Sequence, residues 1–239
     1  MTLLALHNLS KSFGAVTVAD GISFDVPQGQ ALGIIGPNGA GKSSLFNLIT
    51  GNLRPDSGTV HLDGLDITHA PLMKRCQLGI GRSFQIPQPF GKLTVFENLL
   101  VAGAFGQNKS EADVAGECAS VLDRTGLLSK ANIPAGGLSL LDRKRLELAR
   151  AMATNPRLLL LDEIAGGLTD GECAALVQTI RDLHSAGTTI IWIEHVLHAL
   201  TAVVEKVLVL HFGRVLGIGA PAEIMARREV QEIYLGVEA

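Results

Sequence analysis

The chain has 239 residues, of which 47% are hydrophobic and 18% charged, a globular balance that argues against disorder. The formal net charge of −3 gives no broad electrostatic case for a nucleic-acid partner or an anionic lipid surface. No apolar run approaches the ~20 residues that a membrane-spanning helix needs. The N-terminus has neither the basic start nor the apolar stretch of a signal peptide, so we expect the protein to stay in the cytoplasm.

The first part of the chain reads as short strands separated by turns. Turn signals at Gly14, at 27–29 and at 63–64 bound apolar runs that are short enough for strands. The predicted strands lie at residues 3–9, 22–26, 30–35 and 59–62. Two helices are predicted to follow, at residues 94–105 and 110–125, and Ser110 with Asp113 fits the start of the second.

The second half alternates more regularly between helix and strand. A helix is predicted at 140–154, and four leucines at 158–161 predict a buried strand, because a strand covered on both faces need not alternate. Thr169 and Glu172 fit a capping box that opens the next helix, and a strand follows at 188–193. Strand, helix and strand in this order predict a right-handed crossover and a parallel sheet.

The strongest chemical signal is the octapeptide GPNGAGKS, which matches the phosphate-binding loop pattern G-x-x-x-x-G-K-[ST] without deviation. Glycines let backbone amides converge on phosphate oxygens, and the following helix adds its positive end. Lys42 would reach the β- and γ-phosphates of ATP, and Ser43 would ligate Mg²⁺. A glycine-rich turn without a ligand is the alternative, and the strand before and the helix after the loop argue against it. The predicted ATP contacts here are Gly36, Pro37, Asn38, Gly39, Ala40, Gly41, Lys42, Ser43 and Ser44.

A second signal is the leucine strand that ends in Asp162 and Glu163. An acidic residue at the end of a buried strand can hold Mg²⁺, usually through water, so Asp162 is a predicted metal ligand. Glu163 can orient or deprotonate the attacking water. By itself the pattern also fits a strand that runs into a solvated loop, and the phosphate loop upstream favours the catalytic interpretation.

Over nearly its whole length the sequence resembles the nucleotide-binding subunits of ABC transporters, and within them the branched-chain amino acid (Liv-type) importers. The segments that carry the resemblance are GPNGAGKSSLFNLITG, GIGRSFQ, LTVFENLLVAG, KRLELARAMATNPRLLLLDE, IEH and GAPAEIMARREVQEIYLG. It implies one α/β domain over 1–239 with the ABC ATPase fold. In that fold a P-loop NTPase core with a parallel sheet, here 1–85 and 157–239, carries an N-terminal antiparallel β subdomain and an inserted helical lobe, here about 86–156.

The resemblance also assigns roles to single residues. Phe13 falls where the family places an aromatic ring on adenine, with Val18 nearby, and the alternative is a core role for Phe13. Gln85 falls at the Q-loop, which contacts Mg²⁺ and the attacking water and senses the membrane subunit. His195, in IWIEH, matches the switch histidine that contacts the γ-phosphate. The resemblance therefore makes Gln85, Glu163 and His195 the catalytic residues.

The sequence departs from the family in the signature motif, which reads LSGGQ, or LSYGQ in Liv-type chains. The residues here are Leu138, Ser139, Leu140, Leu141 and Asp142, and in the family they act on the ATP of a partner subunit. A leucine in place of the second glycine obstructs close approach to a phosphate, and Asp142 adds a negative charge there unless it points away. We therefore expect a heterodimer with a related ATPase whose signature is intact. The alternative is that this branch tolerates LSLLD.

The resemblance implies partners and a location as well. A second ABC ATPase subunit would sandwich two ATP molecules with this chain, and membrane permease subunits would dock near residues 85–96, with a solute-binding protein as an indirect partner. The chain would sit at the cytoplasmic face of the inner cell membrane, held through the permease subunits, and energise uptake of a small polar solute such as a branched-chain amino acid.

The sequence leaves four other functions to consider. A lipopolysaccharide-export ATPase remains as a close relative, and the text LTVFENLLVAG favours the importers. A DNA-repair ATPase would carry coiled-coil or zinc-bearing insertions, and the sequence has no insertion of either kind. A GTPase would carry the guanine-binding motif N-K-x-D, which the sequence lacks. A non-enzymatic nucleotide sensor is disfavoured because Glu163 and His195 are both present.

Overall fold

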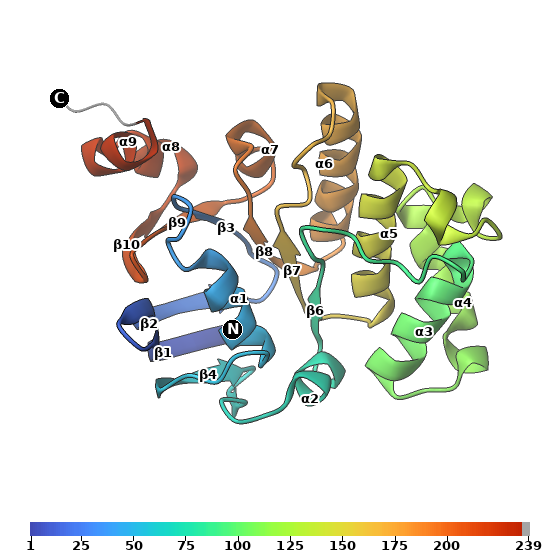
Figure 1. The fold of residues 1–239 in the computed structure, drawn as a ribbon, viewed down its shortest axis with the longest axis horizontal. Helices are drawn as coiled ribbons and strands as arrows, with labels where there is room; N and C mark the ends of the chain where they lie inside the picture. Colours follow the sequence, from blue (N-terminus) through green and yellow to red (C-terminus); the bar gives the residue numbers. More distant parts are fainter. Residues whose placement is uncertain (236–239) are drawn as a thin grey trace.

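The computed structural model describes residues 1–235, and a small antiparallel sheet forms one edge of it (Figure 1). Its strand order is β2-β1-β4-β5, with β1 (Thr2–Phe13), β2 (Val16–Pro27), β4 (Ser57–Leu62) and β5 (Leu65–Asp66). The predicted antiparallel subdomain is therefore confirmed. The strands β1 and β2 are longer than predicted because they form one long hairpin whose register shifts repeatedly, and each shift interrupts the alternation of apolar and polar residues.

The central sheet runs in the order β10-β9-β3-β8-β7-β6, and its described strands are parallel except for β10, which is antiparallel to β9. Its strands are β3 (Ala31–Ile35), β6 (Ile80–Arg82), β7 (Leu158–Asp162), β8 (Thr189–Ile193), β9 (Lys206–His211) and β10 (Arg214–Gly219). This confirms the predicted parallel sheet. The sequence did not predict β6, because three residues are too few to show a period.

The leucine strand β7 contributes to a hydrophobic cluster on each face of the central sheet. Leu158 and Leu160 pack with α1 (Lys42–Thr50) and the antiparallel sheet, whereas Leu159 and Leu161 pack with the helices of the other face. All four side chains are fully buried. The uninterrupted apolar run therefore reflects cover on both faces, as predicted.

Helices cover the sheet and form the lobe on the right of Figure 1. The remaining helices are α2 (Leu72–Gln77), α3 (Val95–Gln107), α4 (Glu111–Arg124), α5 (Leu140–Ala153), α6 (Asp170–Ser185), α7 (Leu197–Thr201), α8 (Pro221–Met225) and α9 (Arg228–Leu235), with short 3₁₀ turns at Leu128–Lys130 and Ala135–Gly137. Both predicted capping boxes are present, at Ser110 with Asp113 and at Thr169 with Glu172. Each satisfies backbone donors at a helix start, which explains why these two starts were visible in the sequence.

The helices α3, α4 and α5 continue the main core, because their buried side chains belong to the same cluster as one face of the central sheet. The exact limits of the helical lobe, about 86–156, stay a prediction. The predicted core extends to residue 239, and the C-terminal segment that carries the family resemblance extends to residue 236. The part of these predictions at residues 236–239 lies outside the described residues. Across residues 1–235 no helix is both long and apolar enough to span a membrane.

Candidate active site

The phosphate loop follows the fully buried strand β3 and leads directly into α1. Gly41, the residue before the helix, has φ 102°, and a Cβ there would lie 2.3 Å from the carbonyl oxygen of Val18. A Cβ on Gly36 would lie 2.2 Å from the carbonyl oxygen of Leu210. Close contacts therefore require glycine at both ends of the loop, and at Gly41 the left-handed backbone conformation requires it as well.

Lys42 lies inside the loop that precedes it. Its Nζ donates to the carbonyl oxygens of Gly36 at 2.8 Å and Pro37 at 3.0 Å. Burial lowers the pKa of Lys42, and the charges of Glu163 and Asp162 oppose that shift. The loop thus holds the ammonium group through its carbonyl oxygens, and phosphate oxygens bound in the loop would accept from Lys42 and from loop amides. The predicted residues Gly36, Pro37, Asn38, Gly39, Ala40 and Gly41 form the loop, and Lys42, Ser43 and Ser44 form the first turn of α1.

Asp162 ends β7 and is buried, as predicted, but it has an arginine partner that the sequence did not reveal. The Nη2 of Arg82, at the end of the neighbouring strand β6, lies 2.7 Å from Oδ2 of Asp162. The Nη1 of Arg82 donates to Oδ1 of Asn47 in α1 at 2.7 Å, and its guanidinium lies 4.9 Å from the ring centre of Phe84. Arg82 therefore links the acidic strand end to the phosphate-loop helix. The arginine within the segment GRSFQ itself was the available signal.

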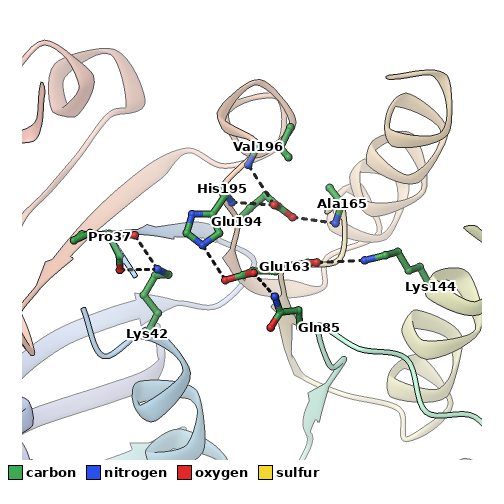
Figure 2. Close-up of polar contacts among 10 residues, drawn as sticks. Pro37, Lys42, Gln85, Lys144, Glu163, Ala165, Glu194, His195 and Val196 are labelled. Carbon is green, nitrogen blue, oxygen red and sulfur yellow. Dashed lines mark hydrogen bonds and ion pairs between the residues drawn. The ribbon is translucent and has the colours of Figure 1, made fainter. Parts of the chain in front are cut away.

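Glu163 follows Asp162 and brings the three predicted catalytic residues together (Figure 2). Its Oε2 accepts from Nε2 of Gln85 at 2.6 Å, and its Oε1 lies 2.9 Å from Nε2 of His195. Asp162 pairs with Ile193 across β7 and β8, so Glu163 and His195 leave the ends of adjacent parallel strands. Figure 2 shows Lys42 across from this cluster. The arrangement puts a carboxylate, an imidazole and an amide beside the phosphate loop.

Two cavities meet at Gln85. One, of about 460 Å³, is lined by Ser43, Gln85 and Asp162 among others, so the predicted Mg²⁺ donors share one space. The other, of about 440 Å³, is lined by Gln85, Glu163 and Leu140 among others. Hydroxyl, amide and carboxylate oxygens are the ligands that Mg²⁺ prefers, and this ion usually keeps waters and substrate phosphates as well. The donor set therefore fits the predicted ion.

The predicted adenine contacts lie on the β1–β2 hairpin. Phe13 pairs with Val16 in the hairpin, and its side chain is 53% exposed, which is not the environment of a core residue. The Nζ of Lys11 lies 5.4 Å from the ring centre of Phe13. Val18 reaches the phosphate loop through its backbone, as the contact at Gly41 shows. The hairpin is thereby tied to the loop, with an aromatic face open at its tip.

In the signature segment, the structure shows where the side chain of Asp142 points. Ser139 is the N-cap of α5 and its hydroxyl donates to Oδ2 of Asp142 at 2.8 Å, while the amide of Asp142 donates back to Ser139 at 3.2 Å. Asp142 is 5% exposed and forms an ion pair with Lys130. The carboxylate of Asp142 thus points into its own chain, which is the case in which it adds no negative charge at a partner's phosphate. Leu141 still places a bulky side chain where the family has a glycine. Of the signature leucines, Leu138 is buried, Leu141 is partly buried and Leu140 is exposed.

Two buried charged residues beside Glu163 were not predicted from the sequence. Glu194 precedes His195, and Lys144 lies in α5. Both are at most 5% exposed. An acid between a buried strand and a predicted switch histidine was the available signal for Glu194. A lysine within a helix normally indicates a solvated face, so Lys144 gave no signal.

The fold and the site together define a phosphate-loop nucleotide hydrolase. The family model for ABC transporters matches residues 19–166. The chain is 34% identical to the high-affinity branched-chain amino acid transport ATP-binding protein LivG of Salmonella typhimurium, with 98% of each chain covered. It is 30% identical to the lipopolysaccharide export system ATP-binding protein LptB of Haemophilus influenzae, with 99% of this chain and 98% of that one covered.

Among solved structures, a nucleotide-free ATP-binding cassette from an ABC transporter superposes with a TM-score of 0.90 at 31% identity, covering 99% of this chain and all of that one. The chain belongs to the ABC transporter family and is an ABC-type ATPase that binds ATP.

Proposed function

We propose that this chain hydrolyses ATP to energise an importer of a small polar solute, such as a branched-chain amino acid. The observation that carries the proposal is the position of Glu163 between Gln85 and His195. A carboxylate held by an amide and an imidazole at the edge of a phosphate loop is arranged to accept a proton from water. The similarity to LivG over 98% of both chains supports the importer class.

In this proposal each site residue has one task. Lys42 and the loop amides bind the β- and γ-phosphates, and the exposed ring of Phe13 stacks on adenine near Val18. Ser43, Asp162 and Gln85 hold Mg²⁺, which neutralises charge on the phosphates when it is bound. Glu163 takes the proton of the attacking water, and His195, whose Nε2 lies 2.9 Å from Oε1 of Glu163, orients it. In this proposal His195 also contacts the γ-phosphate.

The complex that we propose has two further kinds of subunit. A second ABC ATPase places its signature over the ATP at Lys42, and Ser139 of this chain faces the partner's ATP. Since Leu141 replaces the second glycine of the signature, we favour a heterodimer. Permease subunits would hold both ATPases at the cytoplasmic face of the inner membrane.

An apolar groove supports the permease contact. A cavity of about 390 Å³ lies between α2, β6, α3 and α5, beside the Q-loop. Exposed apolar side chains gather along it, namely Leu72, Met73, Phe84, Phe90 and Phe105. Exposed apolar patches of this kind favour a protein partner. Gln85 directly follows Phe84, which lines the groove, and it donates to Glu163, so docking in the groove could affect Glu163 through Gln85.

The test is the ATPase activity of the assembled transporter, purified with the membrane subunits that bind this chain and placed in lipid vesicles. Stimulation by a solute-binding protein loaded with a branched-chain amino acid would support the importer. Stimulation by lipopolysaccharide, with none by any amino-acid-loaded binding protein, would support the export function suggested by the similarity to LptB.

A further inference from the structure

Glu163 has an unusual backbone conformation. Its φ is 47°, in the left-handed region that residues other than glycine rarely adopt. Such a conformation costs free energy and persists only where the surrounding structure fixes it, and it is found most often at functional sites. The contacts that fix Glu163 therefore bear on the position of its carboxylate.

One buried carboxylate ties the loop of Glu163 to the loop of His195 (Figure 2). Oε2 of Glu194 accepts from the amide of Ala165 at 3.0 Å, two residues after Glu163. Oε1 of Glu194 accepts from the amides of His195 at 2.9 Å and Val196 at 3.2 Å. Glu194 is 1% exposed, so these backbone amides provide the hydrogen bonds that water would give to an exposed carboxylate. The two loops thus share one rigid anchor.

A lysine holds Glu163 from the other side. Nζ of Lys144, in α5, lies 3.4 Å from the carbonyl oxygen of Glu163. The amide of Glu163 donates to the carbonyl oxygen of Ile193 at 2.8 Å. Lys144 is buried, and this burial lowers its pKa, while the charges of Glu194 and Glu163 oppose that shift. Because the signature residue Ser139 is the N-cap of α5, Lys144 also connects the backbone of Glu163 to the helix that would face the partner's nucleotide in the proposed dimer.

We propose that Glu194 and Lys144 are positioning residues, which hold Glu163 in its left-handed conformation and so aim its carboxylate at the attacking water. The inference rests on the proposed function, in which Glu163 is the base. The energetic consequence is specific. Loss of either residue should slow the chemical step, because a misplaced base loses orientation without loss of the phosphate contacts.

The first test is Glu194→Gln in the full chain within its assembled complex. The amide keeps the shape of the side chain, but its NH₂ group cannot accept a backbone N–H, so one of the two anchors is lost. We expect kcat to fall at least tenfold, with the KM for ATP changed less than twofold and Tm within about 3 °C of the parent. Glu172→Gln is the matched control, since Glu172 also accepts a backbone N–H but lies at the exposed start of α6.

The second test uses Lys144 and stays informative if Glu194→Gln does not fold. Lys144→Met should lower kcat with little change in KM, and Lys144→Arg should restore at least half of the parent kcat because it can still donate. Arg143→Met is the control, because Arg143 lies next to it on α5 but is exposed and donates to Gly136. Equal effects of Lys144→Met and Lys144→Arg would overturn the role of Lys144.

A double-variant cycle separates this inference from the proposed function. If Glu163 is the base, Glu163→Gln alone should abolish turnover, and added Glu194→Gln should lower it no further. Full turnover in Glu163→Gln would reject the proposed function itself. Loss of turnover in Glu163→Gln, together with a parent-like kcat in Glu194→Gln, would reject only the positioning role. The positioning role would also be rejected if the fall in kcat came with a Tm lowered by more than about 3 °C. A loss of ATP affinity as large as the loss of kcat would reject it too.

Discussion

The Nε2 of His195 lies 2.9 Å from Oε1 of Glu163, although 32 positions separate the two residues in the chain. The contact forms because β7 and β8 are adjacent parallel strands whose ends pair Asp162 with Ile193. Residues that follow such strand ends meet at the same edge of the sheet. The hydrolysis site is therefore a direct product of sheet topology.

Lys42→Ala should weaken ATP binding itself. The buried ammonium of Lys42 is held among loop carbonyls in a position to meet phosphate oxygens, and its loss removes a charge opposed to phosphate. Equilibrium binding of a fluorescent ATP analogue measures the effect, and we expect affinity to fall at least tenfold. Lys109→Ala, at an exposed site in the helical lobe, is the control. Parent-like affinity in Lys42→Ala would remove Lys42 from phosphate binding.

Phe13→Ala should weaken ATP binding by roughly 1–3 kcal/mol if the ring stacks on adenine as in other base–aromatic contacts. The ring is exposed at the tip of the β1–β2 hairpin, so its removal should leave Tm nearly unchanged. Phe105→Ala removes another exposed ring, in α3, and should leave affinity unchanged. Equal ATP affinity for Phe13→Ala and the parent, with a lower Tm, would assign Phe13 to the core instead.

Asp142→Asn should destabilise the fold in a pH-dependent way. Burial acts to raise the pKa of Asp142, but hydrogen bonds from Lys130 and Ser139 and the charges of Lys130 and Arg145 hold it below its usual value. The stabilisation is therefore full above the unfolded pKa of about 3.9 and is lost as pH falls through the lower folded pKa.

Urea unfolding at several pH values measures this contribution. At pH 7 we expect Asp142→Asn to lower the free energy of unfolding by about 1–3 kcal/mol, the range for hydrogen bonds to a charged group. The difference from the parent should shrink as pH approaches 3. A difference that stays constant over that range, or a variant with raised ATPase activity and unchanged stability, would show that the carboxylate faces the nucleotide.

The two ATP sites of the assembled dimer should be unequal. In the proposed dimer the signature of this chain would act on the partner's ATP, and Leu141, in place of a glycine, would obstruct close backbone approach there. The site with Lys42 and Glu163 should therefore turn over, while the opposite site hydrolyses slowly. Replacing the catalytic glutamate of each subunit in turn measures this, and Glu163→Gln should cause much the larger loss. Equal losses would reject the asymmetry.

Motif spacing was sufficient for part of the site. The loop with Lys42 and the pair Asp162 and Glu163 could be predicted because their chemistry requires fixed neighbours in the chain. Gln85 and His195 carry no such neighbours, so only the family resemblance identified them. Capping boxes at Ser110 and Thr169 were likewise local and visible.

The rest depends on tertiary contacts that no local pattern encodes. Arg82 meets Asp162 because β6 lies beside β7, and Glu194 reaches Ala165 across the ends of two strands. Lys144 sits in a helix where lysine usually faces water. The direction of the Asp142 carboxylate was also undetermined, since it follows from the position of Lys130 in the folded chain.

The steady-state ATPase rate of Glu163→Gln tests the central claim most directly. The substitution keeps the shape of the side chain and its hydrogen-bonding reach, but removes the base, so turnover should fall by roughly 10²–10⁴-fold while ATP remains bound. The closed dimer should then persist long enough to be detected by size-exclusion chromatography with ATP. Undiminished hydrolysis by Glu163→Gln would contradict the assignment of Glu163 as the base.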